Sequence, residues 1–175
     1  MKLGFIGTGK IASSVITGIC GSSIKYSKIC ISSRNSKIAK GLKKRFKRIS
    51  IERDNQKIVD SCNWVFLAVT PTVGKKIIKD LKFKSSQIVI SFISTITIPQ
   101  LKEMIKVKAD IVRAIPLPPI SLKKGPVPVS YTHLRAHETR GNLVCRLLLE
   151  KKKFFNDTAT TEIYTILFVG SVRCV

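Results

Sequence analysis

The chain has 175 residues, of which 44% are hydrophobic and 24% are charged, and its formal net charge is +22 at pH 7. These values are typical of a soluble globular protein with one core-containing domain, and they leave little room for a second domain. No apolar run approaches the roughly 18 residues that span a membrane, and glycines interrupt any signal-peptide core near the N-terminus, so we expect a cytoplasmic protein without membrane segments.

Short apolar runs typical of buried strands alternate with amphipathic stretches typical of helices. The expected strands are, in chain order, 2–7, 28–32, 49–52, 64–69, 87–93 and finally 110–115. The expected helices between them are 10–20, 36–46 with Ser36 as its N-cap, 54–62, 71–81 and 98–106. Strands and helices that alternate in this way predict an α/β fold, a doubly wound parallel sheet with helices on both faces.

The first predicted strand leads directly into a glycine turn that opens the first predicted helix. The turn reads Gly7-x-Gly9-x-x-Ala12. In this strand–turn–helix setting the pattern is the Rossmann fingerprint for dinucleotides, because Gly7 permits the tight turn, Gly9 lets the backbone approach a pyrophosphate and Ala12 keeps the helix close to the strand. The helix N-terminus then offers free N–H groups to the phosphates.

The end of the second predicted strand indicates which dinucleotide binds. NAD sites place an Asp or Glu there for the ribose 2′-hydroxyl, whereas this chain has Ser33, Arg34, Asn35 and Ser36 and no carboxylate. Arg34 can stack on adenine and pair with a 2′-phosphate, and the neighbouring polar side chains can add hydrogen bonds. The sequence therefore predicts NADP (NADPH) as the cofactor.

With these residues in place, the chain resembles the pyrroline-5-carboxylate reductases over about residues 1–128. The likeness rests on LGFIGTGKIASSVITGI, SSRN, WVFLAVTPT and VRAIPLPPISLKKGPVPV. The resemblance implies a Rossmann-type NADP-binding domain and the reduction of a small cyclic imine, 1-pyrroline-5-carboxylate, to proline by hydride from NADPH, a step of proline biosynthesis.

Carried over position by position, the resemblance implies cofactor contacts at four places and assigns no catalytic residue. The expected contacts are Gly7, Thr8, Gly9, Lys10 and Ile11 for the pyrophosphate, Ser33 and Arg34 for the 2′-phosphate, Ala68, Val69 and Pro71 for the adenine-side ribose, and Pro116 for the nicotinamide.

Two departures from the family pattern fall near the reacting end of the cofactor. Ser94 and Thr95 stand where the family has Ala and Gly, and Leu117 stands where it has the Asn of a Met-Pro-Asn motif.

The family also completes its active site and its dimer with a C-terminal helical domain, and nothing after Pro128 resembles that domain. We therefore expect the 175-residue chain to be inactive, and the full-length protein to be a homo-oligomer through the missing domain.

The last part of the chain, 129–175, resembles translated adapter DNA. The adapter end AAT GAT ACG GCG ACC ACC GAG ATC TAC AC of short-read sequencing libraries translates as residues 156–165 without a mismatch. Other adapter ends match 129–139, 142–152 and 168–175, in frame and in order. We expect this tail to be an artefact that forms no domain.

The cysteines and histidines predict neither disulfides nor a metal site. The five cysteines contain no CxxC pair, which is typical of free thiols in a reducing compartment. His133 and His137 could be drawn with Glu138 and Cys145 as a metal cluster, but all four lie in the tail.

The positive charge is concentrated in residues 1–128, which hold 25 of the 32 Lys and Arg residues and 6 of the 10 Asp and Glu residues. Such an excess suits phosphate backbones, but no nucleic-acid-binding motif accompanies it, so we expect the lysines to coat helix faces and expect no nucleic-acid partner. Two alternatives stay open: another NADP-dependent imine, ketone or deazaflavin oxidoreductase, and a non-catalytic NADP-binding or basic nucleic-acid-binding protein.

Overall fold

The computed structural model describes residues 1–123, 127–131 and 164–166. The strands are β1 (Lys2–Ile6), β2 (Lys28–Ser32), β3 (Ile49–Glu52), β4 (Trp64–Leu67), β5 (Ile88–Ser91), β6 (Asp110–Ala114), β7 (Val127–Tyr131) and β8 (Tyr164–Ile166). The helices are α1 (Lys10–Cys20), α2 (Ser36–Arg45), α3 (Asn55–Ser61), α4 (Pro71–Asp80), α5 (Ile98–Ile105) and the short 3₁₀ helix η1 (Pro118–Leu122).

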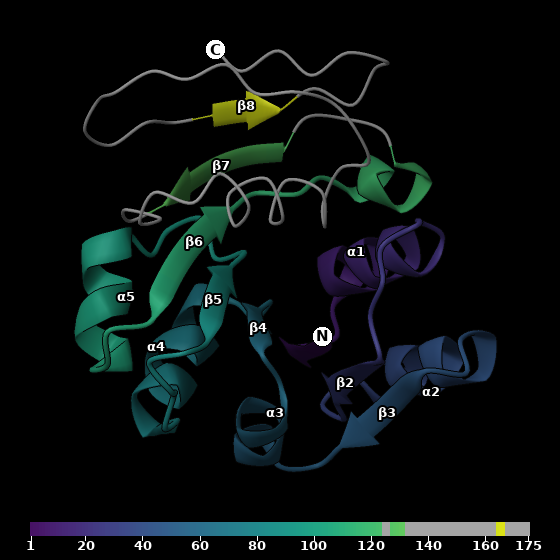
Figure 1. Ribbon diagram of the computed structural model, residues 1–175, viewed down its shortest axis with the longest axis horizontal. Coiled ribbons are helices and arrows are strands. Elements are labelled where there is room, and N and C mark those ends of the chain that lie inside the picture. Colours follow the sequence, from purple (N-terminus) through teal and green to yellow (C-terminus); the bar gives the residue numbers. More distant parts are fainter. Residues whose placement is uncertain (124–126, 132–163, 167–175) are drawn as a thin grey trace.

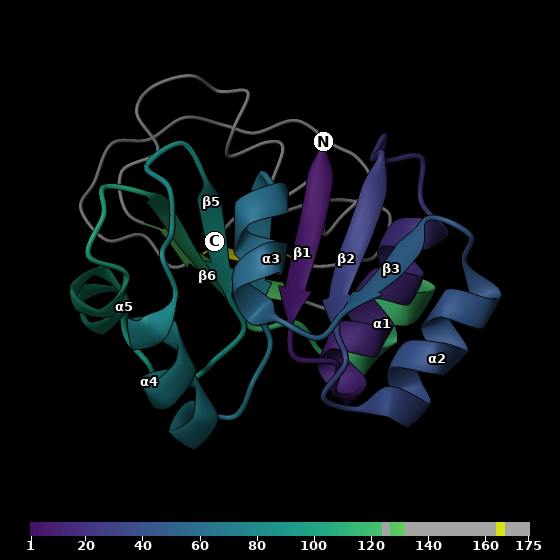
Figure 2. The same cartoon turned by 90° about the horizontal axis from the view of Figure 1, so that it is seen from below.

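The strands form one sheet in the order β3-β2-β1-β4-β5-β6-β7-β8 (Figure 1). From β3 to β6 all neighbours are parallel. This order is that of the Rossmann fold, so the predicted fold class, a doubly wound parallel α/β sheet, is confirmed. The arrowheads of β1 and β2 point toward the edge where α1 and α2 begin (Figure 2). Ligands of such sheets bind at this carboxyl edge.

Helices cover both faces of the sheet because the central strands are apolar on both sides. Leu3 and Phe5 of β1 belong to a core cluster with α1 and α2, and the Phe5 ring stacks on Phe66 of β4 with centroids 4.3 Å apart. Ile6 points to the other face, into a second cluster with α3, α4 and α5. In Figure 2, α3 lies in front of the strands and α1 behind them.

Side-chain caps fix where two of the helices begin. Thr97 and Gln100 form a capping box at the start of α5. The Thr97 side chain accepts from the backbone N–H of Gln100, and the Gln100 side-chain oxygen accepts from the backbone N–H of Thr97. The predicted N-cap of α2, Ser36, is wrong: the cap is Asn35, whose side-chain oxygen accepts from the N–H of Ile38 at 3.3 Å. Asn is as good a cap as Ser, and here it precedes Ser36 by one position.

The sheet does not end at β6, which the sequence predicts as the final strand. β7 pairs antiparallel with β6, and β8 pairs antiparallel with β7. The pairing with β7 covers what would otherwise be an open edge of β6, and the side chains of Val127 and Val129 are buried. β7 also crosses the predicted boundary between the nucleotide-binding domain and the tail, since its last residues, 129–131, belong to the tail.

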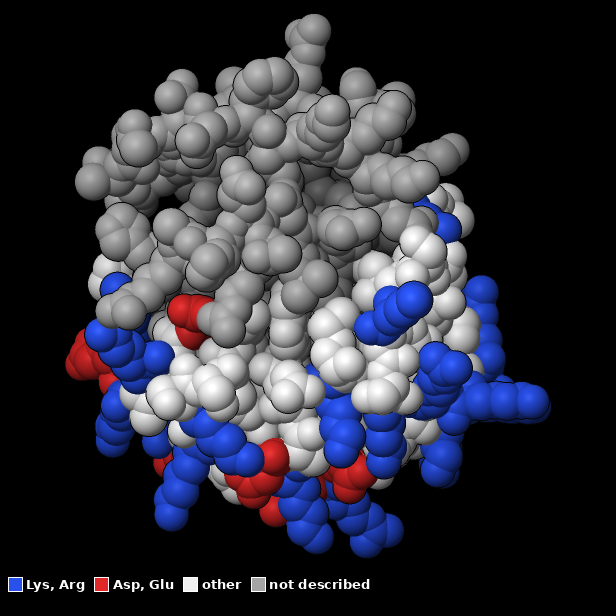
Figure 3. Space-filling model, viewed as in Figure 1, with Lys and Arg blue, Asp and Glu red and all other residues white. Residues whose placement is uncertain are grey.

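Positive charge dominates the visible surface of this sheet-and-helix body, with Lys and Arg side chains spread along its lower and right-hand rim and few acidic groups between them (Figure 3). Among the described residues, no helix is long and apolar enough to cross a membrane.

Candidate cofactor-binding site

A cleft of about 480 Å³ lies at the carboxyl edge of the sheet. Three loops form it, and they follow β1, β2 and β4. The lining residues are Gly7, Thr8, Gly9, Arg34, Asn35, Ser36, Lys37, Ala68, Val69 and Thr70. Because β1 is flanked by β2 on one side and β4 on the other, the cleft sits where the strand order reverses, which is the usual ligand site of doubly wound sheets.

Gly7 closes the turn between β1 and α1 in a conformation that suits only glycine. Its φ is +99°. A Cβ at this position would collide with the carbonyl oxygen of Ala68 and lie 2.8 Å from Cγ1 of Val69. The loop after β1 can therefore rest directly on the loop after β4 only because residue 7 has no side chain.

Gly9 serves a different purpose, because its backbone is extended (φ −77°) and any residue could adopt it. No heavy atom lies within 4 Å of the place that its Cβ would take. The fold thus leaves empty space against the backbone at the start of α1, where no side chain caps the helix. A pyrophosphate fits this cradle, because a helix N-terminus favours an anion and the missing Cβ lets it come close.

A chain of hydrogen bonds ties the glycine turn to the loop after β2. The Gly7 N–H donates to the Ser32 hydroxyl at 2.9 Å. The Thr8 hydroxyl donates to the Ser32 carbonyl at 3.2 Å and accepts from the Asn35 N–H at 3.4 Å. Thr8 and Ser32 are buried, so the two bonds to Ser32 are shielded from water, and the bond from Asn35 is partly so. The Thr8 side chain thus links the two loops, and Thr8 contributes to the cleft wall mainly through its backbone.

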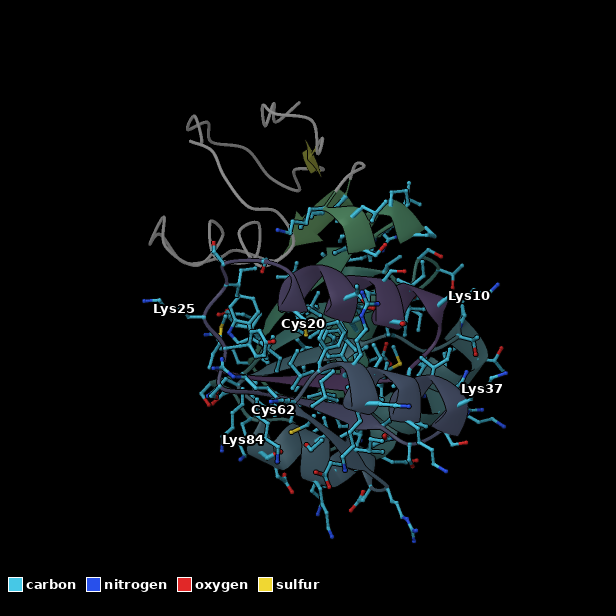
Figure 4. The ribbon with its side chains drawn as sticks, turned by 90° about the vertical axis from the view of Figure 1, so that its right-hand side faces the viewer. Lys10, Cys20, Lys25, Lys37, Cys62 and Lys84 are labelled. Atoms are coloured by element: carbon cyan, nitrogen blue, oxygen red, sulfur yellow. The ribbon has the colours of Figure 1, made fainter. Side chains whose placement is uncertain are left out.

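Two cations line the cleft, Arg34 in the loop after β2 and Lys37 in the first turn of α2, and no Asp or Glu is among the lining residues. Both side chains are exposed. Figure 4 shows Lys37 and Lys10 at the same end of the molecule, where α2 and α1 begin, and Lys25 at the opposite end. An exposed guanidinium and ammonium beside a helix N-terminus suit a phosphate group, and they do not suit the carboxylate–ribose contact of NAD sites. The chemistry of the lining therefore fits the phosphate groups of a dinucleotide.

Seven of the predicted cofactor residues line this cleft, namely Gly7, Thr8, Gly9, Arg34, Asn35, Ala68 and Val69. Ser36, expected only as a polar neighbour that can add a hydrogen bond, also lines it, and Lys37 and Thr70 were not predicted. Thr70 could have been found, since it stands between two residues that were predicted. Lys37 gave a weaker signal, because a lysine in a basic helix looks like any other lysine of that helix.

The other predicted residues lie outside the lining. Lys10 and Ile11 form the first turn of α1, and Pro71 is the first residue of α4. Ser33 donates its N–H to the Glu52 carbonyl at 3.0 Å. Pro116 is buried between β6 and η1.

The positions that depart from the family pattern are open to solvent. Ser94 and Thr95 are exposed in the loop after β5, and Leu117 is 45% exposed before η1. Within the described ranges no group of three or more potential metal ligands occurs. His133, His137, Glu138 and Cys145, which could be drawn as a metal cluster, lie outside the described residues.

The chain is similar in sequence to two curated pyrroline-5-carboxylate reductases. A curated protein from Danio rerio, pyrroline-5-carboxylate reductase 3, is 30% identical over 128 residues, which are 71% of this chain and 44% of that protein. The protein of the same name from Xenopus laevis is 24% identical over 130 residues, 73% of this chain and 47% of that protein. The chain thus spans less than half the length of these relatives.

Solved structures share the fold. The 1-pyrroline-5-carboxylate reductase of Streptococcus pyogenes superimposes with a TM-score of 0.71 at 22% identity, over 89% of this chain and 58% of that one. The Plasmodium falciparum pyrroline carboxylate reductase, solved with NADP bound, gives a TM-score of 0.71 at 22% identity, over 85% of this chain and 54% of that one.

A family model described as "NADP oxidoreductase coenzyme F420-dependent" matches residues 2–95. This segment is more than half of the chain, and it contains every residue that lines the cleft. The chain therefore belongs to this family of nicotinamide-dependent oxidoreductases.

Proposed function

We propose that residues 1–128 are the NADPH-binding half of a reductase that converts 1-pyrroline-5-carboxylate to proline. The observation that carries the cofactor part is the cleft itself, in which a Gly7–Gly9 cradle lies beside Arg34 and Lys37 and no carboxylate interrupts the lining. The names of the curated relatives support the substrate part, since both are pyrroline-5-carboxylate reductases.

Each group of lining residues has one task in this proposal. The glycine turn and the first N–H groups of α1 hold the pyrophosphate. Arg34 and Lys37 hold the 2′-phosphate, with Arg34 able to form two parallel hydrogen bonds and Lys37 acting as a point charge. Bound NADPH supplies the hydride, and the residues of this chain orient the dinucleotide and keep water from its buried side.

Residues 1–123 offer no histidine for proton transfer to the product, and we assign no catalytic acid among them. A protonated imine substrate or a water molecule provides the proton in this scheme. The residues that this chain contributes are binding and positioning residues.

Isothermal titration of the 175-residue chain with NADPH and with NADH tests the cofactor assignment. We expect Arg34→Ala to weaken NADPH roughly 10–100-fold, as loss of a charged hydrogen bond does, and to change NADH affinity less than about twofold. Lys37→Ala should weaken NADPH by a smaller factor, and the matched control Lys25→Ala, at the other end of the molecule, should change neither. Equal weakening of both cofactors by Arg34→Ala would place this side chain away from the 2′-phosphate.

We also propose that this chain binds cofactor without turning over substrate, because nothing after Pro128 resembles the helical domain that completes the family's active site and dimer. A proline-formation assay with NADPH and the imine should remain at the enzyme-free background while NADPH binding is retained. Robust proline formation by the 175-residue chain would contradict this part.

Residues 129–175 are, in this proposal, translated adapter, and the native reading frame is readable to about Pro128. Sequencing the source locus across codon 128 tests it directly. We expect the native frame to continue into a helical domain. Genomic codons that encode the same 47 residues would overturn the adapter assignment.

A second candidate is an NADP-dependent reductase of a different imine or ketone. Exposed Thr95 and Leu117 favour it, because both differ from the family pattern near the expected nicotinamide position. A panel of cyclic imines and ketones, assayed with the full-length enzyme, separates the two candidates by their relative kcat/KM.

A further inference from the structure

Two cysteines that the cofactor cleft does not use lie close together inside the protein. Cys30 is in the middle of β2, and Cys62 is the residue that ends α3. They are 3% and 4% exposed and belong to the same core cluster on the α3 side of the sheet. Figure 4 shows Cys62 on the opposite side of the sheet from Cys20, which lies in α1.

Gly4 of β1 creates the space in which the two thiols approach each other. A Cβ at Gly4 would lie 2.6 Å from Cγ2 of Ile58, 3.0 Å from Sγ of Cys62 and 3.1 Å from Cβ of Cys62, so the Ile58 and Cys62 side chains share the place of the missing side chain. In the parallel pairing of β1 with β2, Gly4 is the direct partner of Cys30. Side chains of paired residues point to the same face, so the Cys30 thiol and the Cys62 thiol are neighbours over one strand spacing, about 4.8 Å.

Polar contacts surround the thiol pair in an otherwise apolar cluster. The Ser50 hydroxyl donates to the Cys30 sulfur at 3.4 Å, and the Ser61 hydroxyl lies 3.7 Å from the Cys62 sulfur. The interaction between the two thiols lowers the pKa of Cys30 and, together with burial, raises the pKa of Cys62. One sulfur of the pair is thereby favoured as the thiolate and the other as the thiol.

We propose that Cys30 and Cys62 are a modification site, at which hydrogen peroxide joins β2 to the end of α3 by an internal disulfide. The thiolate of one cysteine attacks a peroxide oxygen, the O–O bond breaks, and a sulfenic acid forms. The second sulfur then attacks the first, an S–S bond forms and water leaves. In sum, two thiols and one peroxide give one disulfide and two waters, so the sulfurs are oxidised and the peroxide is reduced.

Peroxide reaches the pair through the end of α3. This helix has only 7 residues, and Ser61 at its last position is exposed. Local opening of this end, which breaks the bonds from Gln87 to the Val59 and Cys62 carbonyls, admits a small oxidant to the buried thiols without unfolding of the whole domain. Neither cysteine lines the cofactor cleft, so the disulfide does not depend on the proposed function.

The test uses the full chain with Cys145→Ser and Cys174→Ser, which leaves Cys20, Cys30 and Cys62. The folded protein is treated with hydrogen peroxide, free thiols are blocked with N-ethylmaleimide, and the peptides are analysed by mass spectrometry. We expect a Cys30–Cys62 linked peptide, a maleimide on Cys20, and a melting temperature roughly 5–10 °C higher than in dithiothreitol, because the bond closes a long loop.

Two controls make the result specific. Cys62→Ser should stop the reaction at oxidised acids of Cys30, and Cys20→Ser should leave the linked peptide unchanged. In urea, where the native contacts are lost, disulfides of Cys20 with Cys30 and with Cys62 should also form. No linkage in the folded protein, a link through Cys20, or a sulfinic acid on Cys30 with Cys62 intact would each overturn the proposal.

Discussion

At the scale of single residues, the two glycines of the turn after β1 differ in whether the fold itself requires them. Gly7 is required by the fold, because its positive φ and its contact with the Ala68 carbonyl exclude a side chain. Gly9 is not required by the fold, since its backbone is ordinary and nothing stands near its missing Cβ. The sequence pattern names both glycines but does not distinguish these roles, which depend on the position of the loop after β4.

Substituting the two glycines should therefore separate stability from binding. We expect Gly9→Ala to lower the free energy of unfolding by less than about 1 kcal/mol, the cost of Ala at an N-cap, and to weaken NADPH roughly tenfold or more because the methyl group enters the cradle. Gly7→Ala should instead destabilise the protein by about 2 kcal/mol or more. Urea unfolding and isothermal titration measure the two effects.

Gly41 provides the matched control for both variants. It lies exposed within α2, and no heavy atom is within 4 Å of its Cβ position. Gly41→Ala should stabilise the helix by about 0.5–1 kcal/mol and leave NADPH affinity unchanged. If Gly9→Ala bound NADPH as well as Gly41→Ala does, the cradle would not be a pyrophosphate site.

At the scale of elements, the end of α3 is held by a single buried amide from the segment before β5. The Gln87 side chain is 2% exposed. Its NH₂ group donates to the carbonyls of Val59 and Cys62 at 2.6 and 2.8 Å, and its oxygen accepts from the Lys84 N–H at 2.8 Å. These bonds satisfy carbonyls that the helix end leaves without intrahelical partners.

Removing this amide should lower the free energy of unfolding much more than removing a similar amide at the surface. We expect Gln87→Ala to lower the free energy of unfolding by roughly 2–4 kcal/mol, because buried carbonyls lose their donors. Gln56 is the comparison: it also links α3 to the segment between α4 and β5, through both backbone groups of Lys82, but these bonds are exposed. Gln56→Ala should cost less than about 1 kcal/mol by urea unfolding, and equal losses would contradict the role of burial.

The sequence predicted the alternation of elements from β1 to β6 because every parallel strand is an apolar run with turn residues on both sides. It failed at β7, since the antiparallel partner of β6 is decided by which strand edge is open, and local periodicity does not record that. It also placed the α2 cap on Ser36, because Asn35 and Ser36 are both good caps and only the backbone geometry chooses between them. In the site, the backbone of the glycine turn was predictable, whereas Lys37 depended on the direction in which α2 leaves β2.

At the scale of the whole molecule, the excess of lysine and arginine is a source of self-repulsion. On α2, Lys40 lies three residues from both Lys37 and Lys43 and four residues from Lys44. Like charges at these spacings destabilise a helix, and the repulsion weakens as salt screens it.

Added salt should therefore stabilise the protein. We expect the melting temperature to rise by a few degrees between about 0.02 and 0.2 M sodium chloride, as scanning fluorimetry can measure. Lys40→Glu should raise low-salt stability by about 0.5–1 kcal/mol, because it replaces repulsion by attraction to Lys44. Lys40→Gln, which only removes the charge, should give about half of this gain, and a gain that persists undiminished at 0.5 M salt would rule out an electrostatic cause.

The hydrogen bonds of Gly7 and Thr8 with Ser32, and of Thr8 with Asn35, make the loops after β1 and β2 one frame. A ligand that engages one loop therefore meets the second at a fixed distance and at a high effective concentration, and it orders little additional chain as it binds. In the proposed function NADPH spans both loops, and NADH, which lacks the 2′-phosphate, makes fewer contacts beyond β2 and gains less from the fixed frame.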